Sequence, residues 1–304
     1  MRRDTIAGQL RPGWAARPER LNSFFIRLGA WIAHVLGRTV SRSLLCLICW
    51  YFVAISPRDR SASRRYLGRA LGRKARLIDI FRHFHTFAVT ILDRAYLVKG
   101  QFARFEVRVH GEAIVADMAA RGESCLLLGA HMGSFEIVRF LGRECGGVNV
   151  SLVMYEENAR RLNAALNAID PAAAMRIIPL GKMDSMLEVE SALARREFVG
   201  MLGDRTIEGE GTVSCPFFGD AARFPTGPFR IAAMLDKPVV LMLGLYRGGN
   251  RYDIYFEELA DTRHTERAQR DRALAHAVRS YVARLEHYCR IAPYNWFNFH
   301  DVWK

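Results

Sequence analysis

From about residue 105 onward, short apolar runs alternate with stretches whose apolar residues recur every three or four positions. Such runs are typical of strands buried in a parallel sheet, and the stretches between them are typical of helices. The predicted strands are 105–109, 125–130, 148–155, 175–180, 197–203, 238–246 and 251–259. The predicted helices are 112–122, 134–144, 157–169, 183–196, 229–237 and 265–289. The alternation predicts an α/β fold with a central, largely parallel mixed sheet flanked by helices.

The strongest hydrophobicity lies earlier, in residues 24–55. Its first half is interrupted by Arg27, His34, Arg38 and Arg42, which fall within about 80° of one another on a helical projection. The uninterrupted apolar run that follows, residues 43–55, would be about 20 Å long as a helix, against about 30 Å of bilayer hydrocarbon. This pattern favours an in-plane or partly inserted anchor with its arginines toward anionic head groups. The alternative is a helical subdomain whose apolar face packs on the rest of the protein.

The net charge of +13 is unevenly spread along the chain. Residues 1–110 contain 21 Lys/Arg against 6 Asp/Glu, whereas residues 111–304 contain 23 against 25. A second basic stretch, residues 58–76, follows the apolar run, and no nucleic-acid-binding motif accompanies it. We therefore predict a helical, membrane-associating segment over residues 1–104, an α/β catalytic domain over residues 105–304, anionic lipids as partners and no nucleic-acid partner.

Cysteine usage indicates neither a disulfide framework nor a metal site. The six cysteines are scattered, and the C-x-x-C formed by Cys46 and Cys49 lies inside an apolar run with no second pair and no nearby histidine. Zinc sites need four ligands at characteristic spacings, so packing cysteines are the better interpretation. We expect a reducing compartment, no bound metal and no secretory signal.

The sharpest chemical feature is the segment LLLGAHMGSFE, residues 126–136. A predicted buried strand delivers His131, the chain turns through Gly133, and a helix begins near Ser134 with Glu136 in its first turn. Loops at the carboxyl ends of strands are where α/β folds place their sites.

Taken alone, these residues are also an ordinary strand-end histidine and a carboxylate favoured by a helix dipole. The functional interpretation pairs them: Glu136 would keep one nitrogen of His131 protonated, and the other would accept a proton from a substrate hydroxyl. Ser134 lacks the G-x-S-x-G context of a hydrolase nucleophile, so no covalent intermediate is required.

The H-x-x-x-x-E spacing resembles the catalytic block of the lysophospholipid acyltransferase superfamily, and is most similar to the branch containing the lauroyl and myristoyl transferases of lipid A biosynthesis. The resemblance extends over nearly the whole chain. MLGDRTIEGEG is similar to a family block that places Asp204 and Arg205 at the site. CPFFGDAARFPTGPFRIA is similar to an element that holds a substrate head group. The resemblance assigns to the pocket wall Phe217, Phe218, Gly219, Thr226 and Gly227. We also expect Gly133 and Ser134, beside the histidine, to bind substrate.

Two assignments are open. Other branches carry a glutamate in a Phe-Pro-Glu-Gly-Thr block that binds glycerol phosphate, whereas this chain has Thr226 there, so glycerol-phosphate specificity is in doubt. The resemblance also implies a substrate-binding arginine before the Asp204 block, for which Arg176 is the candidate and Arg160 and Arg161 are rivals. The aromatic tail, residues 294–303, would form either a lipid-facing collar or a closure of the core.

The resemblance implies an acyltransferase that moves a fatty acyl group from an acyl-carrier-protein or coenzyme A thioester to a hydroxyl or amine of a lipid-like acceptor. The basic N-terminal third would attract an acidic carrier protein. We expect the cytoplasmic face of a bacterial inner membrane. A thioesterase using the same pair on water, and a non-catalytic basic membrane-binding protein, are the competing hypotheses.

Overall fold

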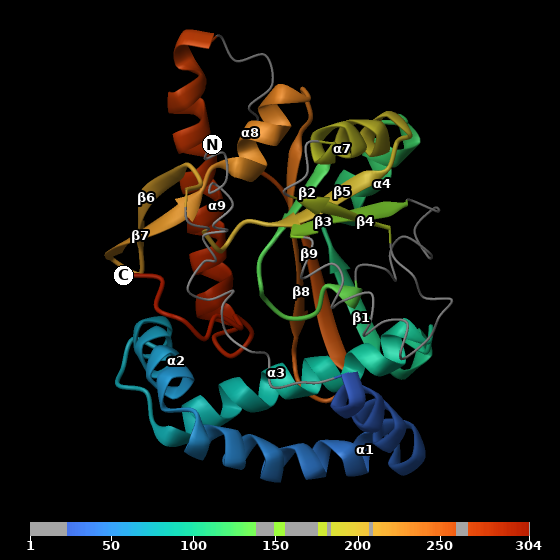
Figure 1. Cartoon of the computed structure of the whole chain (residues 1–304), viewed down its shortest axis with the longest axis vertical. Helices are drawn as coiled ribbons and strands as arrows, with labels where there is room; N and C mark the ends of the chain where they lie inside the picture. The colour runs from blue at the N-terminus through green and yellow to red at the C-terminus, as the bar shows by residue number, and fades with distance from the viewer. Residues whose placement is uncertain are drawn as a thin grey trace, which may run out of the picture.

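The computed structural model describes residues 23–137, 149–155, 176–180, 184–206, 209–259 and 267–303, with side chains from Gly37 onward. A seven-stranded sheet in the order β1-β9-β8-β2-β5-β3-β4 forms its centre. All neighbouring strands are parallel except β8 and β9, which are antiparallel. The predicted class, an α/β fold with a largely parallel mixed sheet, is therefore confirmed (Figure 1).

All seven predicted strands are present, with ends that differ by at most two residues from the prediction. They are β1 (Glu106–His110), β2 (Leu126–Gly129), β3 (Val150–Tyr155), β4 (Ile177–Leu180), β5 (Phe198–Leu202), β8 (Val239–Tyr246) and β9 (Arg251–Glu258). The central strand β2 shows why the pattern was readable. Leu126 and Leu128 enter one core cluster, and Cys125 and Leu127 enter the other, so both faces of the strand are buried.

The helices of the catalytic part are α4 (Glu112–Ala120), α7 (Ser185–Ala194), α8 (Gly227–Met234) and α9 (Arg270–Ile291). They agree with the predicted helices, although α8 begins two residues earlier, with Pro228 in its first turn. The predicted helix 157–169 and most of the predicted helix 134–144 lie outside the described residues.

A two-stranded antiparallel sheet, β6 (Thr212–Phe217) and β7 (Asp220–Pro225), was not predicted. Its turn consists of Phe218 and Gly219, which both have positive φ values, 54° and 85°. Two successive residues of this kind make the tight turn whose twist suits a hairpin. The pattern concealed the hairpin because Phe218, a large apolar residue, stands where turns usually carry Asn, Asp or Gly.

Three N-terminal helices form a layer beneath the sheet in Figure 1: α1 (Ser23–Ile55), α2 (Pro57–Ala70) and α3 (Leu77–Val98). Helix α1 is kinked at Gly37, whose φ of 75° is not helical. Beyond the kink it runs antiparallel to α3, with three successive contacts along its length. These contacts are Arg38 to Asp93, Cys46 to His85 and Trp50 to Phe81.

The other side of α1 carries an exposed apolar stripe at helical spacing, formed by Val40, Leu44, Leu47, Ile48, Tyr51 and Ile55. Among the described residues, Gly37–Ile55 is one helix that is long and apolar enough to cross a membrane, by length and composition only, and 17% of it is buried. The expectation of an apolar N-terminal helix is confirmed. It has one face on the protein and one face outward.

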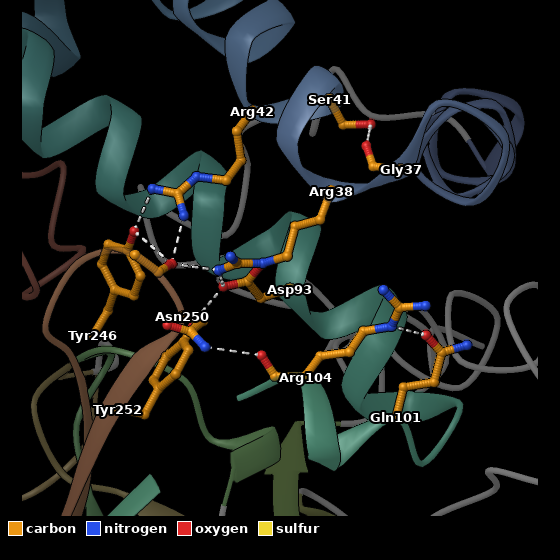
Figure 2. Close-up of polar contacts among 11 residues, drawn as sticks. Gly37, Arg38, Ser41, Arg42, Asp93, Gln101, Arg104, Tyr246, Asn250 and Tyr252 are labelled. Carbon is orange, nitrogen blue, oxygen red and sulfur yellow. Dashed lines mark hydrogen bonds and ion pairs between the residues drawn. The ribbon is translucent and has the colours of Figure 1, made fainter. Parts of the chain in front are cut away.

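The prediction that the arginines of this helix face lipid head groups is wrong for the two whose side chains are described. Arg38 makes a two-pronged ion pair with the fully buried carboxylate of Asp93, at 2.7 and 2.8 Å. Arg42 donates to the hydroxyl of Tyr246 at 2.7 Å and to the carbonyl of Gly249. Figure 2 shows both arginines pointing from α1 toward α3 and the turn between β8 and β9. Arg38 thus binds a buried carboxylate, and Arg42 binds a tyrosine hydroxyl and a backbone carbonyl. No helical projection reveals these partners.

The aromatic tail closes the core. Trp296 is fully buried and Phe297 is 7% exposed. The Trp296 ring packs edge-on against Tyr66 of α2 and Phe217 of β6, with centroids 4.9 and 5.3 Å apart. Side chains of α2 and α3 thus share one core cluster with the sheet. The proposed domain boundary between residues 104 and 105 stays a prediction.

Candidate active site

The loop after β2 carries His131 and is held by close backbone contacts. The Gly133 amide donates to the carbonyl of Asn295 at 2.9 Å, and the Ser134 amide donates to the carbonyl of Gly244 at 2.8 Å. Gly133 has a φ of 64°, and a Cβ there would lie 1.9 Å from the Gly244 oxygen. Only glycine fits this turn. The backbone of His131 is therefore set at the carboxyl edge of the sheet, as predicted.

Asp204, which follows β5, is the partner of His131. Its Oδ1 accepts from the imidazole Nδ1 at 2.8 Å, and its Oδ2 accepts from the His131 amide at 3.0 Å and from the Trp296 indole Nε1 at 2.8 Å. The Asp204 side chain is 0% exposed and that of His131 is 31% exposed. Strands β2 and β5 are parallel neighbours, so the residues that follow them meet at one edge. The contact leaves the Nε2 side of the imidazole as its proton-accepting side.

The environment suits a neutral imidazole beside an ionised carboxylate. Burial raises the pKa of Asp204. The charge that His131 carries when it is protonated, the charge of Arg205, and the hydrogen bonds from His131 and Trp296 outweigh this effect and bring the pKa well below its usual range. Burial and the charge of Arg205 lower the pKa of His131, while Asp204 opposes them. Because an ionised Asp204 only accepts hydrogen bonds, the proton lies on Nδ1 and Nε2 is free to act as a base at neutral pH.

Glu136 does not contact His131 within the part of the chain that the structure describes; the imidazole donates its hydrogen bond to Asp204 instead. Glu136 is buried, its Oε1 lies 2.7 Å from Nε of Arg94 on α3, and Ser134 Oγ donates to its Oε2 at 3.4 Å. The carboxylate of Glu136 therefore contacts α3. A catalytic role for Glu136 stays a prediction.

Arg205 lies beside the pair. Its Nη2 donates to the carbonyl of Phe297 at 3.3 Å, and its charge acts on both His131 and Asp204. The amides of Gly133 and Ser134 are already engaged with carbonyls. Arg205 therefore places a positive charge close to the imidazole, where it could stabilise an oxyanion.

Of the five predicted pocket-wall residues, one packs against the site and four do not contact it in the described part of the chain. Phe217 is fully buried behind the site, where its ring contacts Trp296. Phe218 and Gly219 form the hairpin turn, where the Phe218 amide donates to Glu286. Thr226 precedes α8 and its hydroxyl donates to the Gly211 carbonyl at 3.0 Å. Gly227 packs so closely on the Glu210 carboxylate that a Cβ would lie 2.4 Å from it. None of these last four residues contacts His131 or Asp204 among the described residues.

Arg176 lies away from His131 in the structure. It precedes β4, and its carbonyl pairs with Leu152 near the start of the parallel strand β3. Its guanidinium donates to Glu197, which precedes β5, at 3.1 Å. Both residues lie at the amino ends of parallel strands, the edge opposite His131. The assignment of Arg176 to substrate binding stays a prediction. The rivals Arg160 and Arg161 lie outside the described residues.

Residues that bind the backbone of the segments carrying His131 and Trp296 were not predicted from the sequence. Tyr281 of α9 donates its hydroxyl to the carbonyl of Gly129, the last residue of β2, at 2.9 Å. His83 of α3 contacts the Trp296 carbonyl with Nε2 and the Ser63 hydroxyl with Nδ1, both at 2.8 Å. Burial lowers the pKa of His83 to about 4, so it is neutral and donates from Nε2 to the carbonyl. No local pattern marks these residues, which lie far from His131 along the chain.

Comparison with known proteins places these features in a family. A search of curated proteins found no match. The family model described as bacterial lipid A biosynthesis acyltransferase matches residues 16–304, which include α1–α3, the sheet, the His131 loop and the Trp296 segment. A match over nearly the whole chain confirms the resemblance drawn from the H-x-x-x-x-E block. The chain belongs to the bacterial lipid A biosynthesis acyltransferase family.

Proposed function

We propose that this acyltransferase moves a fatty acyl group from an acyl-carrier-protein or coenzyme A thioester to a hydroxyl, or an amine, of a lipid A-like acceptor, with His131 as general base. The observation that carries the proposal is the His131–Asp204 hydrogen bond. It fixes the tautomer in which Nε2 accepts a proton, and the side chain remains partly exposed at the carboxyl edge of the sheet.

In this mechanism Nε2 of His131 takes the proton from the acceptor hydroxyl as its oxygen attacks the thioester carbonyl carbon. The negative charge that develops on the carbonyl oxygen is stabilised by Arg205. The carbon–sulfur bond then breaks, and the leaving thiolate takes the proton from His131. The ester and a free thiol are the products. Asp204 stays ionised throughout and stabilises the imidazolium between the two proton transfers.

Glu136 belongs to this proposal as a positioning residue, through its ion pair with Arg94 on α3. A direct orienting role would require the imidazole to exchange Asp204 for Glu136 when substrates bind. The variants Asp204→Asn and Glu136→Gln, alone and combined, separate the two roles. If the two residues act independently, the fold-losses in kcat multiply in the double variant. If they share one contact, the double variant is no slower than the slower single variant.

The N-terminal layer supports action at a membrane surface. Helix α1 contacts α3 along its whole length beyond Gly37 and turns its apolar stripe outward. A helix fastened in this way lies in the plane of the interface better than across it. The site at the carboxyl edge lies beside α3, through Glu136 and Trp296. We propose attachment to the cytoplasmic face of the inner membrane, where an acidic carrier protein meets a basic surface.

The test is an assay of thioester consumption with labelled acyl carrier protein, with and without a bacterial lipid extract. We expect consumption that requires the extract and a labelled lipid product. His131→Ala lowers the rate about 100- to 10,000-fold, while the control His110→Ala, an exposed histidine stacked on Tyr255, does not. Consumption without acceptor would indicate a thioesterase. Vesicle binding with no turnover would indicate a binding protein, and a folded His131→Ala protein above a tenth of the wild-type rate would exclude His131 as the base.

A further inference from the structure

A second hollow lies at the same edge of the sheet as His131 but outside the catalytic centre. It is a pocket of about 780 Å³ between α3, the start of β1, the turn between β8 and β9, and the segment 291–295. Four arginines from three of these segments line it: Arg82, Arg108, Arg247 and Arg251. Neither the motif assignments nor the proposed mechanism uses any of them.

The lining is strongly basic. Two carboxylates also line the pocket, and each is paired: Glu106 with Arg108 at 3.3 Å and Asp253 with Arg247 at 3.0 Å. The arginines and carboxylates together leave a net charge of +2. Burial and the charge of Arg42 lower the pKa of His85, another lining residue, so it adds no positive charge at neutral pH. Low-dielectric walls around like charges focus their field on an anion within the hollow.

The pocket shares a wall with the catalytic centre. Asn295 lines the pocket, and its backbone carbonyl accepts the Gly133 amide of the His131 loop at 2.9 Å. Its side chain holds both the amide and the carbonyl of Tyr246, at 2.7 and 3.1 Å. The next residue, Trp296, donates to Asp204. A ligand group bound beside Asn295 would therefore lie next to the backbone that holds the His131 loop and one residue from Trp296, which positions Asp204.

We propose that this pocket binds a phosphate group of one of the two substrates. The inference rests on the proposed function, which supplies two phosphate-bearing candidates: the phosphopantetheine of the thioester donor and the phosphorylated head group of a lipid acceptor. Planar guanidinium groups match phosphate oxygens in pairs and keep their charge at every physiological pH. A phosphate held beside Asn295 leaves the rest of the same substrate free to extend around the 292–296 segment to His131.

The test combines Arg82→Gln and Arg251→Gln in one variant, which removes one guanidinium from α3 and one from the strand edge. Kinetics on the donor side compare an acyl-coenzyme A with the N-acetylcysteamine thioester of the same acid, which lacks phosphate. Kinetics on the acceptor side compare a phosphorylated lipid with its dephosphorylated form. We expect the KM of one phosphorylated substrate to rise at least tenfold, with its phosphate-free analogue and kcat within twofold; the substrate affected identifies the source.

The control is Arg121→Gln, because Arg121 is an exposed arginine like Arg82 and Arg251 but precedes the amino end of β2, the edge opposite the pocket. Calorimetric titration with pyrophosphate gives a readout that needs no turnover. Binding to the wild type and to the control, lost in the double variant, supports an anion site even if no acyl transfer is found. Equal pyrophosphate affinity in the double variant, or unchanged KM for both phosphorylated substrates, would overturn the proposal.

Discussion

Asp204 and Asp93 are two buried aspartates that differ in what holds them. Both side chains are 0% exposed, and both accept from an aromatic residue, the Trp296 indole for Asp204 and the Tyr252 hydroxyl for Asp93. Asp204 pairs with a histidine, which loses and gains a proton near neutral pH, whereas Asp93 pairs with Arg38, which stays charged. The same carboxylate therefore prepares a base in one place and fastens a helix in the other.

The largest expected effect comes from Asp204→Asn. The asparagine amide offers an N–H where the imidazole needs an acceptor, so the tautomer that leaves Nε2 free is disfavoured. By analogy with the aspartate of serine proteases we expect kcat to fall about 1,000-fold or more, with the circular dichroism spectrum unchanged. Single-turnover acyl transfer measures it. A loss below tenfold would mean that Asp204 does not set the state of His131.

Asp93→Asn should lower stability and leave catalysis unchanged, in contrast to Asp204→Asn. It leaves Arg38, 15% exposed, without its counter-ion, and we expect the free energy of unfolding to fall by about 3 kcal/mol, with kcat per folded molecule within twofold. Urea unfolding in detergent measures the loss. The matched control is Asp79→Asn, where the partner Arg73 is 47% exposed, so the loss should be about 1 kcal/mol. Equal losses would show that burial of the arginine is not what matters.

Trp296→Phe removes one donor to Asp204 and keeps most of the ring. A hydrogen bond to a charged group contributes about 1.5–3 kcal/mol, so kcat should fall at least about tenfold, while KM for the thioester stays within twofold. Trp303→Phe is the control, because its indole donates to the Phe217 carbonyl at 3.1 Å and does not reach Asp204. It should lower stability only. A kcat loss in both variants would indicate general loosening of the core.

The smallest expected effect is a shift in pH dependence. Burial and Arg205 lower the pKa of His131, so the neutral base persists below the usual histidine range. Activity should be complete at neutral pH and fall only as the pH drops through this lowered pKa. Arg205→Gln should move the acidic limb of kcat/KM to higher pH, and Asp204→Asn should move it to lower pH. A limb that moves in neither variant would assign the titration to another group.

Features that depend on a local pattern of residues could be predicted from the sequence, whereas features that depend on contacts between distant residues could not. The seven strands were readable because each packs one or both faces against the core, which produces an apolar or alternating pattern within a few residues. The hairpin of β6 and β7 was concealed by Phe218 at its turn. The sequence did not show that Arg176 lies at the opposite edge of the sheet from His131, because an arginine beside a strand gives no sign of which end of the sheet it occupies. Arg38 and Arg42 were assigned to head groups because their partners lie 55 and 204 residues away.

The sequence by itself determined the α/β class, the apolar N-terminal helix, the family and the position of His131 at the end of a buried strand followed by a glycine turn. Only the tertiary structure decided what that histidine touches. Asp204 lies 73 residues further along the chain and Trp296 another 92, and they meet because β5 pairs beside β2 and the tail packs under both. Strand order is a property of the packed sheet, so the partner of the base appears only when the strands are assembled.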